Sequence, residues 1–226
     1  AENILQQSNR SVIQEARKYI TEDYPSAEDA LAGARDIVAQ IIADDSDIRS
    51  EVRRKATEWG SIHSTKIKSA DDEKELFKVY YEFESRVKWI KSYQILALNR
   101  GVDAKILRVK IEISERDWLP IVHQKYRPNN RSEWAEQLEL AIADGSKRLL
   151  LPAIERDIHR TLTETAHVHA IEVFAENVRR LLLQPPLSGY VVLGIDPGFR
   201  SGCKVSVVDR TGKVLGTATI YPNPPQ

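Results

Sequence analysis

A single acidic residue near the end of the chain is the first candidate for chemistry. Asp196 ends an apolar run and is followed by Pro197 and Gly198, so it lies where an expected strand passes into a tight turn. A carboxylate in such a place can bind Mg²⁺, which prefers hard oxygen ligands and assists cleavage of phosphodiester bonds. Acids at strand ends also act as turn formers, and both interpretations stay open for Asp196.

One carboxylate does not make a metal-dependent active site, because such sites need several acids that converge on the ions. Asp209 is the only other acid after Asp196, and it precedes Arg210-Thr211-Gly212, a predicted hairpin turn. We expect Asp209 to be a solvated turn residue. The sequence therefore predicts no complete catalytic site, no bound metal and no cofactor.

The segment from Arg86 to Lys110 is strongly basic. It holds seven Lys or Arg residues and a single acid. Trp89 and Tyr93 lie between these cations and are available to stack on bases, while the cations are suited to contact phosphates. We therefore predict a nucleic-acid-binding surface that includes Arg86, Lys88, Lys91, Arg100 and Arg108.

Other features have plainer explanations. The cations of this segment could form a solvated face that pairs with acids such as Glu82 and Glu84. His167 and His169 point roughly 200° apart if they lie on a helix, so they are not expected to share a metal ion. The sequence contains no glycine-rich phosphate loop, no Gly-x-Ser-x-Gly motif and no Cys/His pair suited to covalent catalysis.

Composition favours a cytoplasmic protein without a membrane segment. The 226 residues are 42% hydrophobic, and the 33 basic residues balance the 33 acidic ones, so a nucleic-acid-binding surface must be local. The single cysteine, Cys203, fits a reducing compartment. No apolar stretch is long enough for a membrane helix, and the start does not resemble a signal peptide. The absence of methionine suggests that the N-terminus is a cut.

Helical periodicity dominates residues 1–184, which we expect to form one domain. Ser26 with Asp29 forms a capping box, and Gly60 is expected to end a helix that begins at Ser46-Asp47. Helices are expected at about 4–20, 26–42, 46–59, 71–83, 132–144 and 149–183. An edge strand is expected at 61–68, and a β insertion at 104–113 after a turn at Asn99-Arg100-Gly101. Three tryptophans are expected in the core: Trp59, Trp118 and Trp134.

The pattern changes to strands after Pro185-Pro186, where we place a domain boundary. Residues 190–195 form a continuous apolar run of the kind found in buried central strands. Two further strands are expected at 204–209 and 214–221. The second expected domain, 188–226, would thus contain three strands.

Several separated motifs resemble one known family, the Tex proteins, over nearly the whole length. The segment from Leu193 to Pro222 is similar to the start of their YqgF-type, ribonuclease H-like domain. Five earlier segments are similar to the helical region that leads into that domain: 30–37, 97–101, 144–156, 170–177 and 181–186. The resemblance implies a mainly α fold with a small β insertion, followed by a truncated α/β ribonuclease H-like domain.

The resemblance also implies a function. Tex proteins are regarded as transcription accessory proteins that bind nucleic acid, RNA or DNA, and that could contact the transcription machinery. They carry a C-terminal S1 domain, a fold that binds single strands. Their YqgF-like domain is not established as a nuclease, so Asp196 would be vestigial. Two alternatives stay open: a resolvase-type nuclease in which Asp196 is a metal ligand, and a purely structural helical scaffold.

Overall fold

The computed structural model describes residues 1–185, 187–198 and 201–222. The chain divides into two compact units, Ala1–Glu172 and Val173–Gln226. The domain boundary expected at Pro185-Pro186 includes residue 186, which lies outside the described residues, and its position stays a prediction.

The first unit begins with two short helices, α1 (Glu2–Gln6) and α2 (Val12–Arg17). The prediction of one helix over 4–20 was wrong. Gln7 has a left-handed backbone, φ 47°, which ends α1, and the polar residues after it carry no apolar face that could continue the helix. The Gln7 side chain instead joins a distant loop, where it accepts from the Asn129 amide at 2.5 Å.

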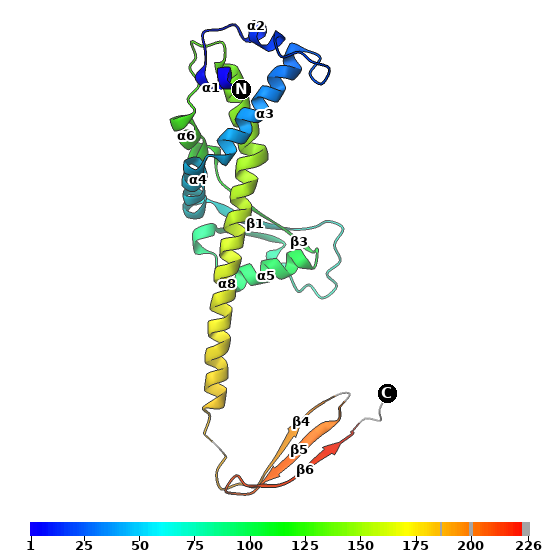
Figure 1. Ribbon diagram of the computed structural model, residues 1–226. Coiled ribbons are helices and arrows are strands. Elements are labelled where there is room, and N and C mark those ends of the chain that lie inside the picture. Colours follow the sequence, from blue (N-terminus) through cyan, green and yellow to red (C-terminus); the bar gives the residue numbers. More distant parts are fainter. Residues whose placement is uncertain (186, 199–200, 223–226) are drawn as a thin grey trace. The chain divides into compact units, whose positions relative to one another are not determined.

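Four helices form the packed part of this unit (Figure 1). They are α3 (Ala27–Asp44), α4 (Ser46–Trp59), α6 (Glu115–Lys125) and α7 (Ala135–Gly145). The predicted capping box of Ser26 and Asp29 is confirmed, whereas the N-cap of α4 is Asp45 rather than Ser46. Gly145 lets α7 approach α3, because a Cβ at that position would lie 2.8 Å from the Ala39 carbonyl oxygen. The sequence analysis did not predict α6, which contains Pro120.

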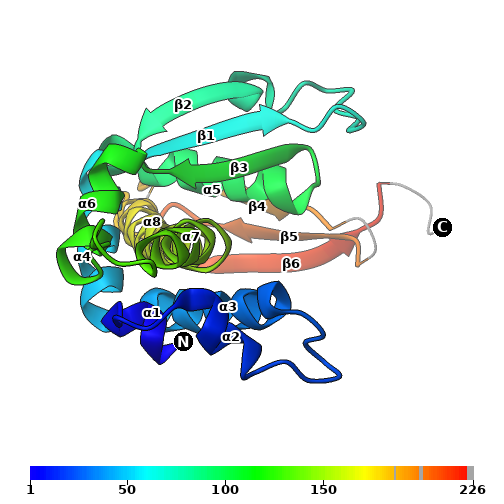
Figure 2. The same cartoon turned by 90° about the horizontal axis from the view of Figure 1, so that it is seen from above.

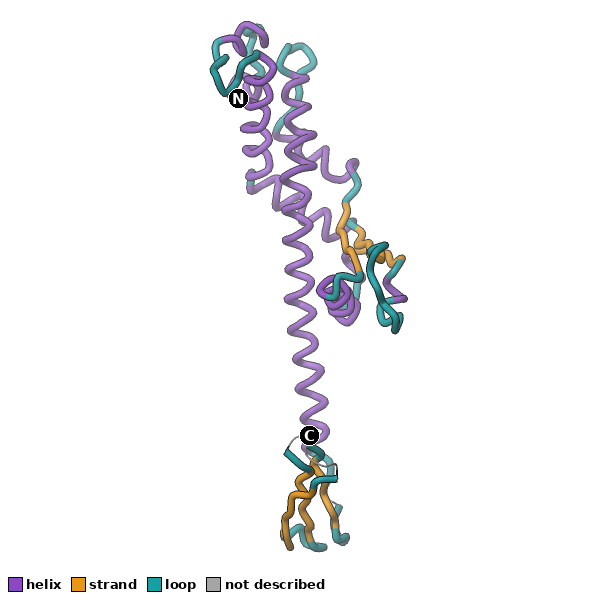
Figure 3. The backbone as a smooth tube through the Cα atoms, turned by 90° about the vertical axis from the view of Figure 1, so that its right-hand side faces the viewer, coloured by secondary structure: helices purple, strands orange, loops and turns teal. Residues whose placement is uncertain are grey.

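The expected helices at 132–144 and 149–183 are parts of one continuous helical path. A π-helical segment, Ser146–Leu150, joins α7 to α8 (Leu151–Leu182), as the tube in Figure 3 shows. The extra residue of a π turn lets the backbone continue without a loop. Ile154, Ile158 and Ala166 of α8 are buried against the core of the first unit.

A three-stranded antiparallel sheet lies beside these helices (Figure 2). Its order is β2 (Glu82–Arg86), β1 (Ser61–Lys66), β3 (Leu107–Glu112). The strand predicted at 104–113 is confirmed, but β1 is the central strand of this sheet rather than an edge. The helix expected at 71–83 was wrong: only the 3₁₀ turn Lys78–Tyr80 is helical. Asp72 caps a loop there, since its carboxylate accepts from the amides of Leu76 and Phe77 at 3.1 Å.

Helix α5 (Ser92–Asp103) covers one face of the sheet and replaces the turn expected at Asn99-Arg100-Gly101. Gly101 is needed for contact rather than for turning, because a Cβ there would lie 2.5 Å from Leu107 Cδ1. Ile95 and Leu98 of α5 are buried in the same layer. A short 3₁₀ turn, Val87–Trp89, connects β2 to α5.

The second unit contains three strands in the antiparallel order β4 (Val192–Asp196), β5 (Cys203–Val208), β6 (Val214–Ile220). The hairpin turn at Arg210-Thr211-Gly212 is confirmed, with Gly212 at φ 87°. The run 190–195 is not a buried central strand among the described residues, since β4 pairs only with β5 and Leu193 is 57% exposed. The predicted fold class, mainly α with a small β insertion and a strand-rich end, is confirmed.

Candidate nucleic-acid interface

The first part of the basic segment runs from the end of β2 into α5. Arg86 ends β2, and its guanidinium donates to the Trp59 carbonyl oxygen. Lys88 lies in the 3₁₀ turn and Lys91 is the N-cap of α5. All three cations are exposed. The strand end, the turn and the helix start thus present them along one short connection.

Two aromatic side chains are exposed in the same connection. Trp89 is 68% exposed and Tyr93, in the first turn of α5, is 67% exposed. Large aromatic side chains in a well-packed unit normally bury most of their surface, so two neighbouring exposed ones next to cations are suited to stack on bases.

Arg100 and Tyr93 are seven residues apart on α5 and therefore lie on the same face of the helix. Tyr80 is close to both. Burial raises the pKa of Tyr80, and the Tyr93 phenol raises it further, while Arg100 acts in the opposite direction. Tyr80 also packs edge-on against Phe83, with ring centroids 5.3 Å apart. The sequence analysis did not single out Tyr80, because it placed this residue inside a helix.

Arg108 does not lie on this surface. It pairs with Thr65 on the sheet, whereas the neighbouring positions Leu107 and Ile111 are buried toward α5 and α8. Alternate residues of a strand point to opposite faces, so Arg108 belongs to the face that α5 leaves uncovered. Lys110 shares that face, opposite His63. The structure therefore divides the predicted site into two groups: Arg86, Lys88, Lys91 and Arg100 around α5, and Arg108 on the open face of the sheet.

The cations of the basic segment have no carboxylate partners within the described residues. No ion pair within 4.0 Å there involves any of its seven Lys and Arg side chains. Glu84 approaches His63 instead, at 4.0 Å, and Glu82 makes no ion pair in the same part of the chain. The alternative in which these two acids neutralise the segment therefore has no support in the contacts.

Asp196 and Asp209 lie at opposite ends of the β4–β5 ladder. Asp196 is opposite Lys204, whereas Asp209 follows Val208, which is opposite Val192. Five strand positions of about 3.4 Å each separate the two acids by roughly 17 Å, too far to share an ion. Asp209 Oδ1 accepts from the Thr211 hydroxyl at 2.7 Å and from the amides of Thr211 and Lys213, and these bonds hold its pKa below the usual value. The prediction of a turn acid is confirmed.

The remaining predicted residues are simply placed. Trp118 and Trp134 are buried, as expected, but Trp59 is 51% exposed at the end of α4. Its expected core role was wrong because Gly60 turns the chain away at once.

His167 and His169 both lie on α8. Among the described residues, no group of three or more metal-binding side chains comes together, and none of the described helices is long and apolar enough to cross a membrane.

Comparison with known proteins agrees with this architecture. The family described as Tex central region-like matches residues 7–174, and the Tex protein YqgF-like domain matches residues 190–226. The chain is 42% identical over 213 residues to YdcI of Bacillus subtilis, covering 93% of this chain and 30% of that protein.

Two relatives have more informative names. The transcriptional accessory protein Tex of Neisseria gonorrhoeae is 31% identical over 98% of this chain and 30% of its own length. A human S1 RNA-binding domain-containing protein 1 is 31% identical over 86% of this chain and 21% of its own length. The chain thus spans less than a third of each of these relatives. The match of the central region over most of the chain, together with this order of elements, shows that the chain belongs to the Tex family.

Proposed function

We propose that this chain is the central, nucleic-acid-contacting part of a transcription accessory protein. The names of two relatives support the proposal, one as a transcriptional accessory protein and the other as a protein with an S1 RNA-binding domain. The activity of the whole protein is part of the proposal, because the chain covers only a fraction of these relatives.

One observation carries the proposal: the basic segment combines cations that lack carboxylate partners among the described residues with the exposed rings of Trp89 and Tyr93. Cations without a carboxylate neighbour attract phosphates more strongly, because no nearby negative charge offsets theirs. Bases can stack on exposed aromatic rings whatever the nucleotide sequence. The group around α5 contains both kinds of side chain. Single-stranded nucleic acid, whose bases are free to stack, therefore suits this surface better than a duplex.

We also propose that the chain performs no catalysis by itself. The wide separation of Asp196 and Asp209 and the engagement of Asp209 in its turn support this part. Incubation of the chain with Mg²⁺ and end-labelled RNA or DNA tests it. Cleavage that disappears in an Asp196→Asn variant would overturn it in favour of a metal-dependent nuclease.

Binding at several salt concentrations tests the proposed nucleic-acid contact. Labelled single-stranded RNA and duplex DNA are titrated with the chain and with a variant in which the four cations around α5, Arg86, Lys88, Lys91 and Arg100, are changed to Gln. Each lost phosphate contact lowers the slope of log K against log salt by about 0.7 for a single strand. We expect weaker binding and a slope reduced by about 3 if all four cations contact phosphates.

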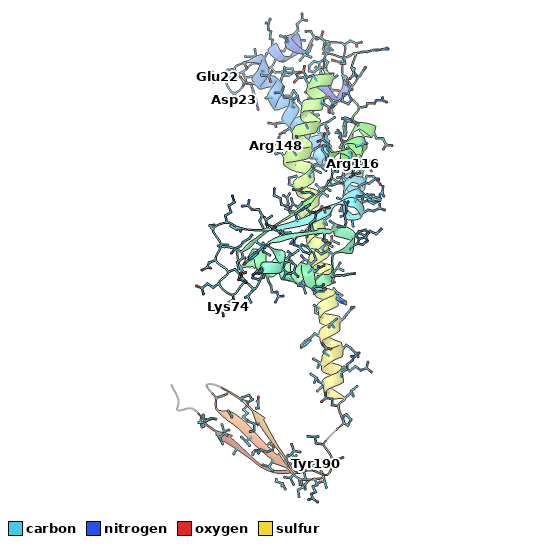
Figure 4. The ribbon with its side chains drawn as sticks, turned by 180° about the vertical axis from the view of Figure 1, so that it is seen from behind. Glu22, Asp23, Lys74, Arg116, Arg148 and Tyr190 are labelled. Atoms are coloured by element: carbon cyan, nitrogen blue, oxygen red, sulfur yellow. The ribbon has the colours of Figure 1, made fainter. Side chains whose placement is uncertain are left out.

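A matched control removes the same charge elsewhere. Four exposed arginines outside the basic segment, which pair with no carboxylate among the described residues, serve for this: Arg17, Arg53, Arg116 and Arg131. Figure 4 labels Arg116 at the start of α6. Equal losses in both quadruple variants would mean that net charge alone attracts the ligand. No binding at low salt would favour the alternative of a structural scaffold.

A further inference from the structure

The outer edge of β3 and the first part of α8 border an open groove of about 510 Å³. Figure 2 shows β3 as the strand of its sheet that lies toward α8. Aliphatic side chains form much of the lining, among them Leu107, Val109 and Ile111. Across the groove, α8 contributes Glu155, Arg156, His159 and Arg160, whose spacing places them on one side of the helix.

The β3 edge offers unused backbone groups to this groove. The Ile106 carbonyl accepts from the Ile67 amide at 2.8 Å and therefore points toward β1. Strand residues alternate in this respect, so Leu107, Val109 and Ile111 direct their N–H and C=O groups away from β1. The Ile111 N–H confirms the direction, because it donates to Glu155 Oε1 at 3.1 Å. Within the described residues, the backbone groups of Val109 make no such bond to another segment, and Val109 is half-buried, whereas Leu107 is only 2% exposed.

Charge around the groove is one-sided. Four cations line it, Lys105, Arg108, Arg156 and Arg160, against one acid. That acid, Glu155, is already engaged by the Ile111 amide. Arg160 pairs with Asp157 at 3.2 Å, whereas the other three cations have no carboxylate within 4.0 Å among the described residues.

We propose that this groove binds an extended acidic peptide segment of a partner protein by adding a strand to the free edge of β3. Backbone hydrogen bonds to the N–H and C=O of Val109 would align the peptide, and apolar side chains at alternate positions would enter the aliphatic lining. Acidic side chains between them would meet Lys105 and Arg156 at the rim. Unpaired strand edges are usually covered, which fits an edge at Val109 whose cover is a ligand.

The lining favours a peptide over nucleic acid. No Phe, Tyr or Trp side chain contributes to the groove, and His159 is the one aromatic ring among its lining residues, so it lacks the paired large rings found around α5. Backbone donors and acceptors at two-residue intervals match the repeat of a strand. Lys105 and Arg108 of the basic segment border this groove, whereas the exposed rings and the four cations around α5 do not, so the peptide site does not depend on the surface around α5.

Fluorescence anisotropy with a labelled ten-residue peptide of alternating glutamate and valine tests the proposal on the whole chain. We expect binding, slower hydrogen exchange at the Val109 amide, and no binding of the same peptide with lysine in place of glutamate. Val109→Pro removes the outward N–H without removing a bond to β1, and it should weaken binding by at least about tenfold. The control Val109→Ala keeps that N–H and should weaken binding by less than about threefold.

A charge variant keeps the test valid if Val109→Pro disturbs the fold. Arg156→Gln combined with Lys105→Asn removes two rim cations, and asparagine tolerates the left-handed backbone of Lys105, φ 57°. Binding of the acidic peptide should weaken severalfold at low salt and change little at high salt. Equal binding of the glutamate and lysine peptides, or unchanged affinity in both variants, would overturn the proposal. So would protection of the Val109 amide by single-stranded RNA instead of peptide.

Discussion

The helical region and the sheet region of the first unit contain the same kinds of cation in different surroundings. In the helical region, formed by α3, α4, α6, α7 and the π segment, some cations join elements to one another, although Arg53 and Arg116 do not pair with any residue that the structure describes. Arg148 contacts both Asp36 and Asp144 at 2.6 Å, and Lys125 contacts Asp45 at 2.7 Å. In the sheet region, formed by β1–β3 and α5, the seven cations of the basic segment have no such partners among the described residues.

The contrast separates two uses of charge. A cation that contacts carboxylates of two elements helps to hold these elements together. The neighbouring negative charges reduce its attraction for a negatively charged ligand. A cation without a carboxylate neighbour adds little to folding and remains attractive to phosphates or acidic groups. The difference predicts that changes in the helical region alter stability, whereas changes in the sheet region alter binding.

A pair of tryptophans should show the largest contrast. Trp134 is 3% exposed and donates from Nε1 to the Arg10 carbonyl oxygen at 2.8 Å. Trp134→Ala leaves a cavity and an unpaired carbonyl, and should lower the free energy of unfolding by about 3–5 kcal/mol. Trp89→Ala should change it by less than about 0.5 kcal/mol, because the ring is exposed. Urea unfolding followed by circular dichroism measures both, and similar losses in the two variants would remove the contrast.

The N-cap of α4 should show the next largest effect. Asp45 accepts from the Ile48 amide at 3.2 Å, the Tyr126 hydroxyl at 3.0 Å and Lys125. Asp45→Ala removes a cap and leaves buried donors unpaired, so we expect a loss of about 1–3 kcal/mol in the free energy of unfolding. Asp45→Asn, which keeps the side-chain shape, should lower the free energy of unfolding by less than Asp45→Ala does.

The same residue gives a pH dependence. Burial alone would raise the pKa of Asp45, but hydrogen bonds from Lys125, the Ile48 amide and Tyr126 lower it below its usual value. The ionised form therefore stabilises the fold above the usual carboxyl pKa of about 3.9, and this contribution is lost as pH falls through the lower folded value. The melting temperature of the wild type should fall more steeply below about pH 4 than the melting temperature of Asp45→Asn. If the melting temperatures of the two proteins fell in parallel as the pH is lowered, the ionised Asp45 would not contribute to stability.

Single exposed cations should give the smallest effects. Arg148→Gln breaks contacts to Asp36 and Asp144 at the surface and should lower the free energy of unfolding only slightly, by less than Asp45→Ala. Figure 4 labels Arg148. Lys88→Gln breaks no ion pair seen in the described residues and should leave stability unchanged. A loss in Lys88→Gln equal to that in Arg148→Gln would show that the sheet region uses its cations for folding as well.

Local signals in the sequence predicted many of the elements. The capping box at Ser26 predicted the start of α3, β-branched alternation predicted β3, and the Thr211-Gly212 turn fixed the last hairpin. The failures needed information from distant residues. Asp72 looks like a helix start but caps a loop, and Gly101 looks like a turn but packs against Leu107.

The same limit applies to the candidate interface. The charge run from Arg86 to Lys110 is visible in the sequence, but its division between two faces is not. That division follows from α5, which the sequence analysis did not predict, and from the pairing of Arg108 with Thr65. Tyr80 was missed for a related reason, since it reaches Tyr93 and Arg100 only after β2 and α5 have formed.

Ultraviolet cross-linking of single-stranded, uridine-rich RNA to the chain, followed by mass spectrometry of the cross-linked peptides, tests the central claim most directly. Aromatic side chains that stack on bases form such cross-links, and the exposed aromatics Tyr19 and Tyr24 near the start of the chain serve as internal controls. The account predicts cross-links at Trp89 and Tyr93 that are lost at high salt. Cross-links confined to Tyr19, Tyr24 or other residues outside the sheet region would contradict it.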